Sequence, residues 1–97
     1  VAQGSRSLAD ALKVGAAIEE IDILDLQKAI AATDEAAIKQ VYQNLLSGSE
    51  NHLRSFASTL ERVTGETYRP QYLSQAAYDA IVSGSTCGGR NAGRRGR

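Results

Sequence analysis

The stretch Ala29-Ile-Ala-Ala-Thr-Asp-Glu-Ala-Ala-Ile38 (AIAATDEAAI) decides the fold, because it holds a very short break between two long helical patterns. The first pattern runs from about Ser7, its predicted N-cap, to this break. The second is predicted to begin with Thr33 as its cap and to end at Gly65. Helices joined by so short a connection lie antiparallel and side by side. The sequence therefore predicts an all-α fold built on an antiparallel helical hairpin.

A loop and a short helix follow the hairpin. In the loop ETYRPQYL, Pro70 keeps the preceding residue extended, and Ser74 is the predicted cap of a helix over residues 75–82. Three tyrosines are predicted to pack this region against the hairpin while their hydroxyls stay in water: Tyr68, Tyr72 and Tyr78. We divide the chain into an N-terminal extension (1–6), the hairpin with its short helix (7–83) and a disordered Gly/Arg-rich tail (84–97).

Length and composition set further bounds. A chain of 97 residues forms one small domain of marginal stability, so we expect a partner or a dimer. The single cysteine, Cys87, excludes an internal disulfide and a cysteine zinc site. No apolar run approaches the roughly 20 residues that span a bilayer, so we expect a soluble protein without membrane contact. The chain begins with Val1, which fits a fragment or a processed product, and leaves open whether the protein is cytoplasmic or exported.

The charges are distributed unevenly. All eleven acidic residues lie between Asp10 and Asp79, whereas the tail carries arginines and no acid. Phosphate contacts by such a tail would give weak nucleic-acid binding. Because no aromatic residue is interleaved with the arginines, we expect a solvated terminus rather than a nucleic-acid arm.

Two polar residues fall within the apolar stripes of the predicted helices. On the first helix, Glu19 lies near the centre of the stripe and Asp22 at its edge, whereas Glu20 is assigned to the rim or to solvent. On the second helix, His52 lies in the middle of the stripe. The stripe residues on the two helices are Leu8, Leu12, Gly15, Ile23, Leu26 and Ile30, and Ile38, Val41, Tyr42, Leu45, Phe56, Leu60 and Val63.

Folding the hairpin at its break brings Glu19 level with the segment from Ser49 to His52. A buried carboxylate must be protonated, paired or bound to a cation. Two interpretations remain open: Glu19 and His52 form a polar pair, or they share a metal such as iron, manganese or zinc, for which oxygen and imidazole ligands are suitable.

The runs VGAAIEEIDILDLQKAI and NHLRSF and the ending TGETYRPQYLSQAAYDAI, in this order, resemble the C-terminal half of the ferritin-like proteins in domain-of-unknown-function family 2202. The resemblance covers roughly residues 10–82. It implies a four-helix bundle made of two helix pairs, related to the di-iron carboxylate proteins, in which each pair supplies a Glu and then a Glu-x-x-His. By this resemblance Glu19 is the first carboxylate and His52 the histidine, with Asp22 as an outside candidate ligand for iron or manganese.

The sequence departs from that pattern in two ways. Ser49 stands where the Glu of Glu-x-x-His is expected, and the preceding helix pair is absent from the chain. We therefore expect a homodimer of hairpins, or association with a missing N-terminal helix pair. The function predicted is a metal-binding ferritin-like protein with a degenerate half-site. Ferroxidase-like activity stays open, although none is expected from this chain alone; the alternative is a metal-free structural or interaction module.

Overall fold

The computed structural model describes residues 2–84, which form three α-helices and no strand. The helices are α1 (Ala2–Ala32), α2 (Ala36–Thr64) and α3 (Gln75–Val82). The predicted all-α hairpin with a short third helix is thus confirmed. The rest of the predicted tail, including Cys87, lies outside the described residues. None of the helices described is long and apolar enough to cross a membrane.

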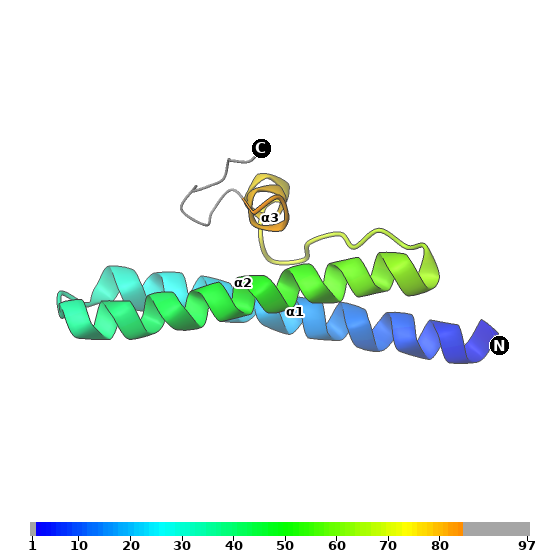
Figure 1. Cartoon of the computed structure of the whole chain (residues 1–97), viewed down its shortest axis with the longest axis horizontal. Helices are drawn as coiled ribbons and strands as arrows, with labels where there is room; N and C mark the ends of the chain where they lie inside the picture. The colour runs from blue at the N-terminus through cyan, green and yellow to red at the C-terminus, as the bar shows by residue number, and fades with distance from the viewer. Residues whose placement is uncertain (1, 85–97) are drawn as a thin grey trace, which may run out of the picture.

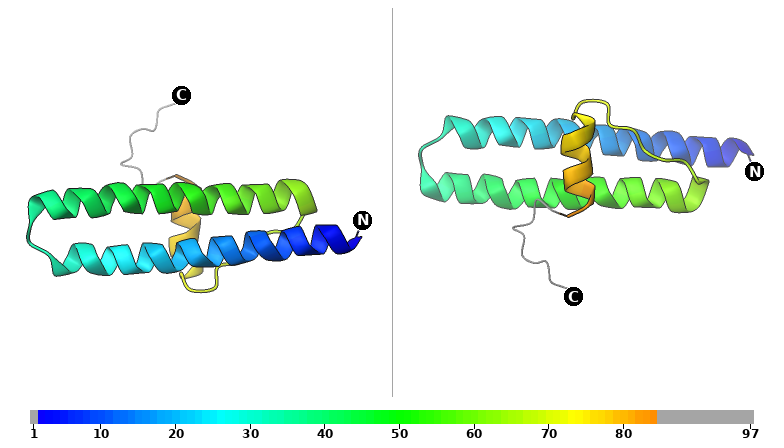
Figure 2. Two further views of the ribbon diagram at one scale, coloured as in Figure 1. Left: turned by 90° about the horizontal axis from the view of Figure 1, so that it is seen from below. Right: turned by 90° about the horizontal axis from the view of Figure 1, so that it is seen from above.

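The two long helices lie side by side and antiparallel, and α3 crosses them on one side (Figures 1 and 2). The main contact is between α1 and α2 along their length, and α3 packs on α2. The loop that follows α2 runs back over the hairpin before α3 begins (Figure 2). The opposite side of the hairpin carries no further element of the described chain.

Of the four residues predicted to cap or stop a helix, two are confirmed. Gly65 ends α2 in the left-handed conformation, with φ 77°, and its N–H donates to the carbonyl of Glu61 at 2.8 Å. The Ser74 hydroxyl accepts from the N–H of Ala77 at 3.1 Å and caps α3.

The other two predicted capping residues, Ser7 and Thr33, are wrong. The first helix starts at Ala2, so Ser7 lies inside it and does not cap it. The residue at the N-cap of α2 is Glu35, without a side-chain cap bond. Thr33 instead accepts the N–H of Glu35 at 3.2 Å, which stabilises the turn before the helix.

The buried core lies between the long helices and extends toward α3. On α1 it uses Ala9, Ala16 and Ile23, which recur every seven residues and therefore share one side of the helix. The small alanines let the neighbouring segments approach closely. The remaining core residues come from α2, the loop and α3: Leu53, Leu60, Tyr68, Leu73, Tyr78 and Ile81.

The predicted apolar stripes are only partly buried. Ile23 and Leu60 are core residues, but several members of the stripes are exposed: Leu8, Ile38, Val41, Leu45 and Val63. They lie on the side of the hairpin away from α3, where no other layer of the described chain packs. We call this side, which carries Glu19, Leu45 and His52, the open face.

Candidate functional site

Glu19 and His52 meet on the open face. Glu19 projects from α1 and His52 from α2, and the carboxylate Oε2 lies 3.4 Å from the imidazole Nδ1. The two helices therefore bring together an acid and an imidazole from distant parts of the sequence, at the register that folding at the break predicts.

The two side chains differ in exposure. The Glu19 side chain is 15% exposed, but that of His52 is 66% exposed. The burial that its place in the apolar stripe predicts for His52 is therefore wrong within one hairpin. His52 lies at the edge of the α1–α2 contact, and nothing in the described chain covers it from the other side.

The Glu19 carboxylate is incompletely satisfied. Its Oε2 faces His52, while its Oε1 is buried and has no hydrogen-bond partner among the described residues. A buried polar atom without a partner is costly, by about 1–3 kcal/mol. The atom therefore marks a place where a donor or a cation would be stabilising.

Two open grooves flank the Glu19–His52 pair. The larger has a volume of about 570 Å³ and is also lined by Asp22, Asp25 and Ser49. The smaller, of about 300 Å³, is bounded by Ser55 and Phe56. The grooves give both members of the pair access to solvent and to a ligand.

Two other residues singled out in the sequence, Asp22 and Ser49, lie beside the Glu19–His52 pair. Asp22 is exposed in the larger groove, beside the pair, and Ser49 lines the same groove. Glu50 is buried and does not line either groove. In the part of the chain that is described, no three acidic, histidine or cysteine side chains form a metal-binding group. The open face thus holds a pair of polar side chains, Glu19 and His52.

A second polar centre lies on the opposite side of the hairpin, at Glu20. This carboxylate is completely buried. Its Oε1 accepts the N–H groups of Tyr72 at 2.7 Å and Leu73 at 2.8 Å, and both oxygens accept that of Gln71 at 3.0–3.1 Å. The hydroxyl of Tyr68 donates to Oε2 at 2.5 Å. We call these four donors the Glu20 cradle.

The cradle explains how an acid is accommodated in the core without a cation. Burial raises the pKa of Glu20, but the hydrogen bonds from Tyr68 and the three backbone N–H groups outweigh it, so the pKa is lowered overall. The pKa of Tyr68 is raised, first by burial and then by its bond to Glu20. Burial and the charge of Glu20 also raise the pKa of Tyr78. The carboxylate is therefore held ionised and both phenols neutral.

The assignment of Glu20 to rim or solvent is wrong, and so is the expectation of a wet hydroxyl on Tyr68. The sequence predicts a hydrophobic stripe on α1 that is centred near Glu19. In the structure, the buried side of α1 is centred nearer to Ala16 and Ile23. Glu20 lies four residues after Ala16 and three before Ile23, so this heptad spacing was the signal that could have placed it. The first of the donors, Tyr68, lies 48 residues after Glu20, beyond the reach of any local pattern.

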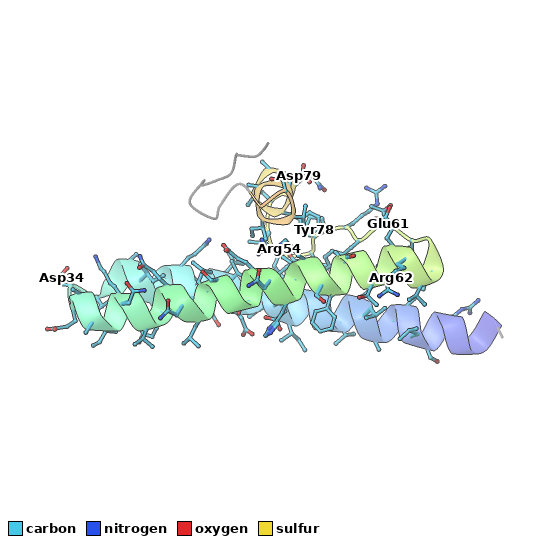
Figure 3. The ribbon with its side chains drawn as sticks, viewed as in Figure 1. Asp34, Arg54, Glu61, Arg62, Tyr78 and Asp79 are labelled. Carbon is cyan, nitrogen blue, oxygen red and sulfur yellow. The ribbon has the colours of Figure 1, made fainter. Side chains whose placement is uncertain are left out.

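Arg54 ties the end of α3 to α2. Its Nη1 donates to the carbonyl of Ile81 at 2.7 Å, and its Nη2 donates to Asn51. Arg54 and Tyr78 approach each other at the crossing of α2 and α3 (Figure 3). Since the last carbonyls of a helix lack intrahelical partners, the guanidinium both satisfies one of them and complements the helix dipole. The side of the hairpin that carries α3 is thus closed by specific polar contacts.

A family model described as "Uncharacterized protein domain (DUF2202)" matches residues 1–85. The Uncharacterized protein MJ0754 of Methanocaldococcus jannaschii is 50% identical over 91 residues, which are 94% of this chain and 49% of that protein. The crystal structure of hypothetical protein MJ0754 from Methanococcus jannaschii has a TM-score of 0.72 and 52% identity, over 77% of this chain and 42% of that chain. The chain spans about half the length of this relative.

Proposed function

This chain belongs to the DUF2202 family, as its sequence predicts, and from that premise we propose that it binds a transition-metal ion through Glu19 and His52. The observation that carries the proposal is the buried Oε1 of Glu19, which has no partner among the described residues and lies beside an accessible imidazole. The architecture proposed is one half of a ferritin-like four-helix bundle, with the open face toward the other half.

The chemistry of the two donors fits iron or manganese. Carboxylate oxygen and imidazole nitrogen are ligands that both metals accept. Glu19 is held in place by its burial on α1, and His52 is free to adjust because two thirds of its side chain is exposed. Asp22 lines the larger groove but does not form a three-residue metal-binding group with Glu19 and His52. A bound ion would supply positive charge to the orphan oxygen and, for iron, a redox centre.

Two ligands alone bind a metal weakly, so the site requires donors from a second hairpin. The open face provides the surface on which such a hairpin would pack, with Glu19 and His52 near its middle. The Ser49 hydroxyl, at the position of a bridging carboxylate in the resemblance, leaves the site poorer in acid than a full di-iron centre. We therefore propose metal binding without assigning a catalytic reaction.

Calorimetric titration with MnCl₂, and with Fe²⁺ under anaerobic conditions, tests the proposal. The wild-type chain is expected to bind, and His52→Ala and Glu19→Gln are expected to weaken binding at least tenfold. Glu61 is an exposed glutamate on α2 away from the two grooves. Glu61→Gln is therefore the matched control, and this variant should bind the metal as the wild type does. Absence of binding by the wild-type chain at millimolar metal would refute the proposal.

The direct contact between Glu19 and His52 also favours a second candidate, a metal-free helical module in which the two form only a polar pair. Under this alternative His52→Leu keeps or raises the thermal stability, because an apolar side chain suits the open face. A metal site predicts instead that metal raises the melting temperature of the wild type and not that of this variant.

A further inference from the structure

A third groove lies on the side of the hairpin that carries α3. Its walls come from α2, the following loop and α3, and its volume is about 520 Å³, a size typical of small-molecule sites. We call it the α3 groove. Its charged residues are Arg54 and Glu61 from α2 and Asp79 from α3, while Ala57 and Val82 give it apolar surface. The labelled side chains lie around the crossing of the two helices (Figure 3).

The hydroxyl of Tyr78 has no partner in this groove. Tyr78 is only 7% exposed, and its ring packs on that of Tyr68 with the centroids 5.7 Å apart. Its hydroxyl forms no hydrogen bond with any described residue. Among those residues, the side-chain atom that is both unpaired and sealed from solvent is Oε1 of Glu19. The Tyr78 hydroxyl therefore reaches solvent, and it does so through the groove that Tyr78 lines.

Negative charge surrounds this hydroxyl. Glu61 and Asp79 stand on two walls of the groove, and no cation of the described chain forms an ion pair with either carboxylate. Burial, and then the charges of Glu20, Asp79 and Glu61, raise the pKa of Tyr78. The phenol therefore stays neutral, and its oxygen can accept a hydrogen bond from a cationic donor.

Arg54 does not neutralise the acidic end of the groove. Its guanidinium donates to the carbonyl of Ile81 and to the side chain of Asn51. Glu61 lies seven residues further along α2, which is two helical turns or about 10 Å. The two opposite charges on the α2 wall are therefore separated, and the end at Glu61 favours a cation.

We propose that the α3 groove binds the alkylammonium group of a small aliphatic amine. An ammonium group has three N–H donors and no acceptor, which suits a neutral hydroxyl that lies among carboxylates. The alkyl chain would pack on Ala57 and Val82. A metal ion fits this groove less well, because no three acidic, histidine or cysteine side chains of the described residues form a metal-binding group. The inference does not depend on the metal site proposed on the open face.

Two-dimensional NMR of the whole isotope-labelled chain tests the proposal. The chain is titrated with putrescine at constant ionic strength, in EDTA so that no metal contributes. We expect saturable shifts at millimolar amine for the amides of Thr67, Tyr78 and Asp79, and none for that of His52. The diol of the same chain length, which has the shape of the amine without its charge, should not bind.

Two variants test the residues. Tyr78→Phe removes only the hydroxyl, and Asp79→Asn removes a charge but keeps an oxygen that can accept from the side chain of Gln75. Each variant is expected to weaken amine binding at least fivefold. Tyr72→Phe and Asp34→Asn are the matched controls, because both side chains are exposed outside the groove. The two controls should bind the amine as the wild type does.

Three results would overturn the inference: no saturable shift at millimolar amine, equal binding of the diol, or unchanged amine binding by Tyr78→Phe. Because the hydroxyl has no partner in the described chain, Tyr78→Phe should melt at the wild-type temperature. If it melts lower, Asp79→Asn decides, since Asp79 is exposed and its replacement leaves the core intact. Unchanged amine binding by Asp79→Asn would then overturn the inference, and weakened binding would support it.

Discussion

Glu20 shows how one side chain fixes the position of a distant segment. Its two oxygens accept from Tyr68 and from three consecutive backbone N–H groups that begin directly after Pro70. Those backbone groups belong to a loop, where no helix or sheet would satisfy them. The carboxylate therefore replaces secondary structure as the partner of the loop, and it holds the loop against α1.

Replacement of Glu20 by Gln is expected to destabilise the fold. The amide has one acceptor oxygen and brings an NH₂ group against N–H donors, so the cradle cannot be satisfied. We expect a loss of about 2–4 kcal/mol in the free energy of unfolding. Urea denaturation followed by circular dichroism measures it, with Glu61→Gln as the exposed control. Equal stability of the two variants would show that the cradle does not stabilise the loop.

Tyr68→Phe removes a single donor from the cradle. Because the carboxylate keeps its three backbone donors, the expected loss is smaller, about 1–2 kcal/mol. In a double-mutant cycle with Glu20→Gln, we expect a coupling energy of about 1 kcal/mol or more, since the two side chains are in direct contact. Additive losses would mean that the hydroxyl and the carboxylate act independently.

The cradle also predicts the pH dependence of stability. The pKa of Glu20 is lowered in the folded protein from its ordinary value of 4.5, so its stabilisation is complete above that pH and is lost as the pH falls toward the lowered pKa. The pKa of Tyr68 is raised above its ordinary value of 10.0, so stability also falls as the pH rises beyond 10. Urea midpoints measured between pH 2 and 11 should decline at both ends. In Glu20→Gln the acid-side decline should be reduced, and an unchanged acid limb would assign it to other carboxylates.

At the level of single residues, the Glu19–His52 pair could be predicted from the sequence, but the Glu20 cradle could not. Glu19 and His52 could be paired because helix spacing and the hairpin register are both local rules. Glu20 could not, because its donors depend on the path of a loop that is set by tertiary contacts. The exposure of His52 was also beyond prediction, since the apolar pattern does not say whether its partner lies in the same chain.

Helix ends were predictable where backbone conformation demands a particular residue. Gly65 adopts a positive φ that residues with a Cβ rarely adopt, and Ser74 offers a hydroxyl to an exposed N–H. Ser7 and Thr33 have the same side-chain chemistry, but α1 continues past Ser7 and the turn shifts the start of α2 to residues after Glu35. A capping residue therefore marks a helix end only where the chain must also change direction.

Gly65→Ala tests the end of α2. A Cβ added there meets no atom within 4 Å, so the whole effect comes from the left-handed backbone conformation. We expect a loss of about 1–2 kcal/mol in the free energy of unfolding, because alanine disfavours this conformation. Gly65→Asn, which tolerates it better, should lose less. If alanine and asparagine gave the same stability as glycine, the backbone at this helix end would have to relax on substitution.

For the molecule as a whole, the two sides of the hairpin differ in kind. One side is closed by α3, by the Glu20 cradle and by the bond from Arg54 to Ile81. The open face carries exposed apolar side chains, with Glu19 and His52 at its middle. The all-α class, the hairpin and the short third helix could be predicted because they follow from local periodicity and from the short connection. The extent to which the apolar stripes of α1 and α2 are buried could not be predicted, because it depends on which elements cover each side of the hairpin.

Anomalous X-ray diffraction from crystals of the whole chain grown with Mn²⁺ is the measurement that tests metal binding on the open face most directly. We expect a manganese peak between the carboxylate of Glu19 and the imidazole of His52. The absence of a peak at Glu19 and His52 would contradict the metal site.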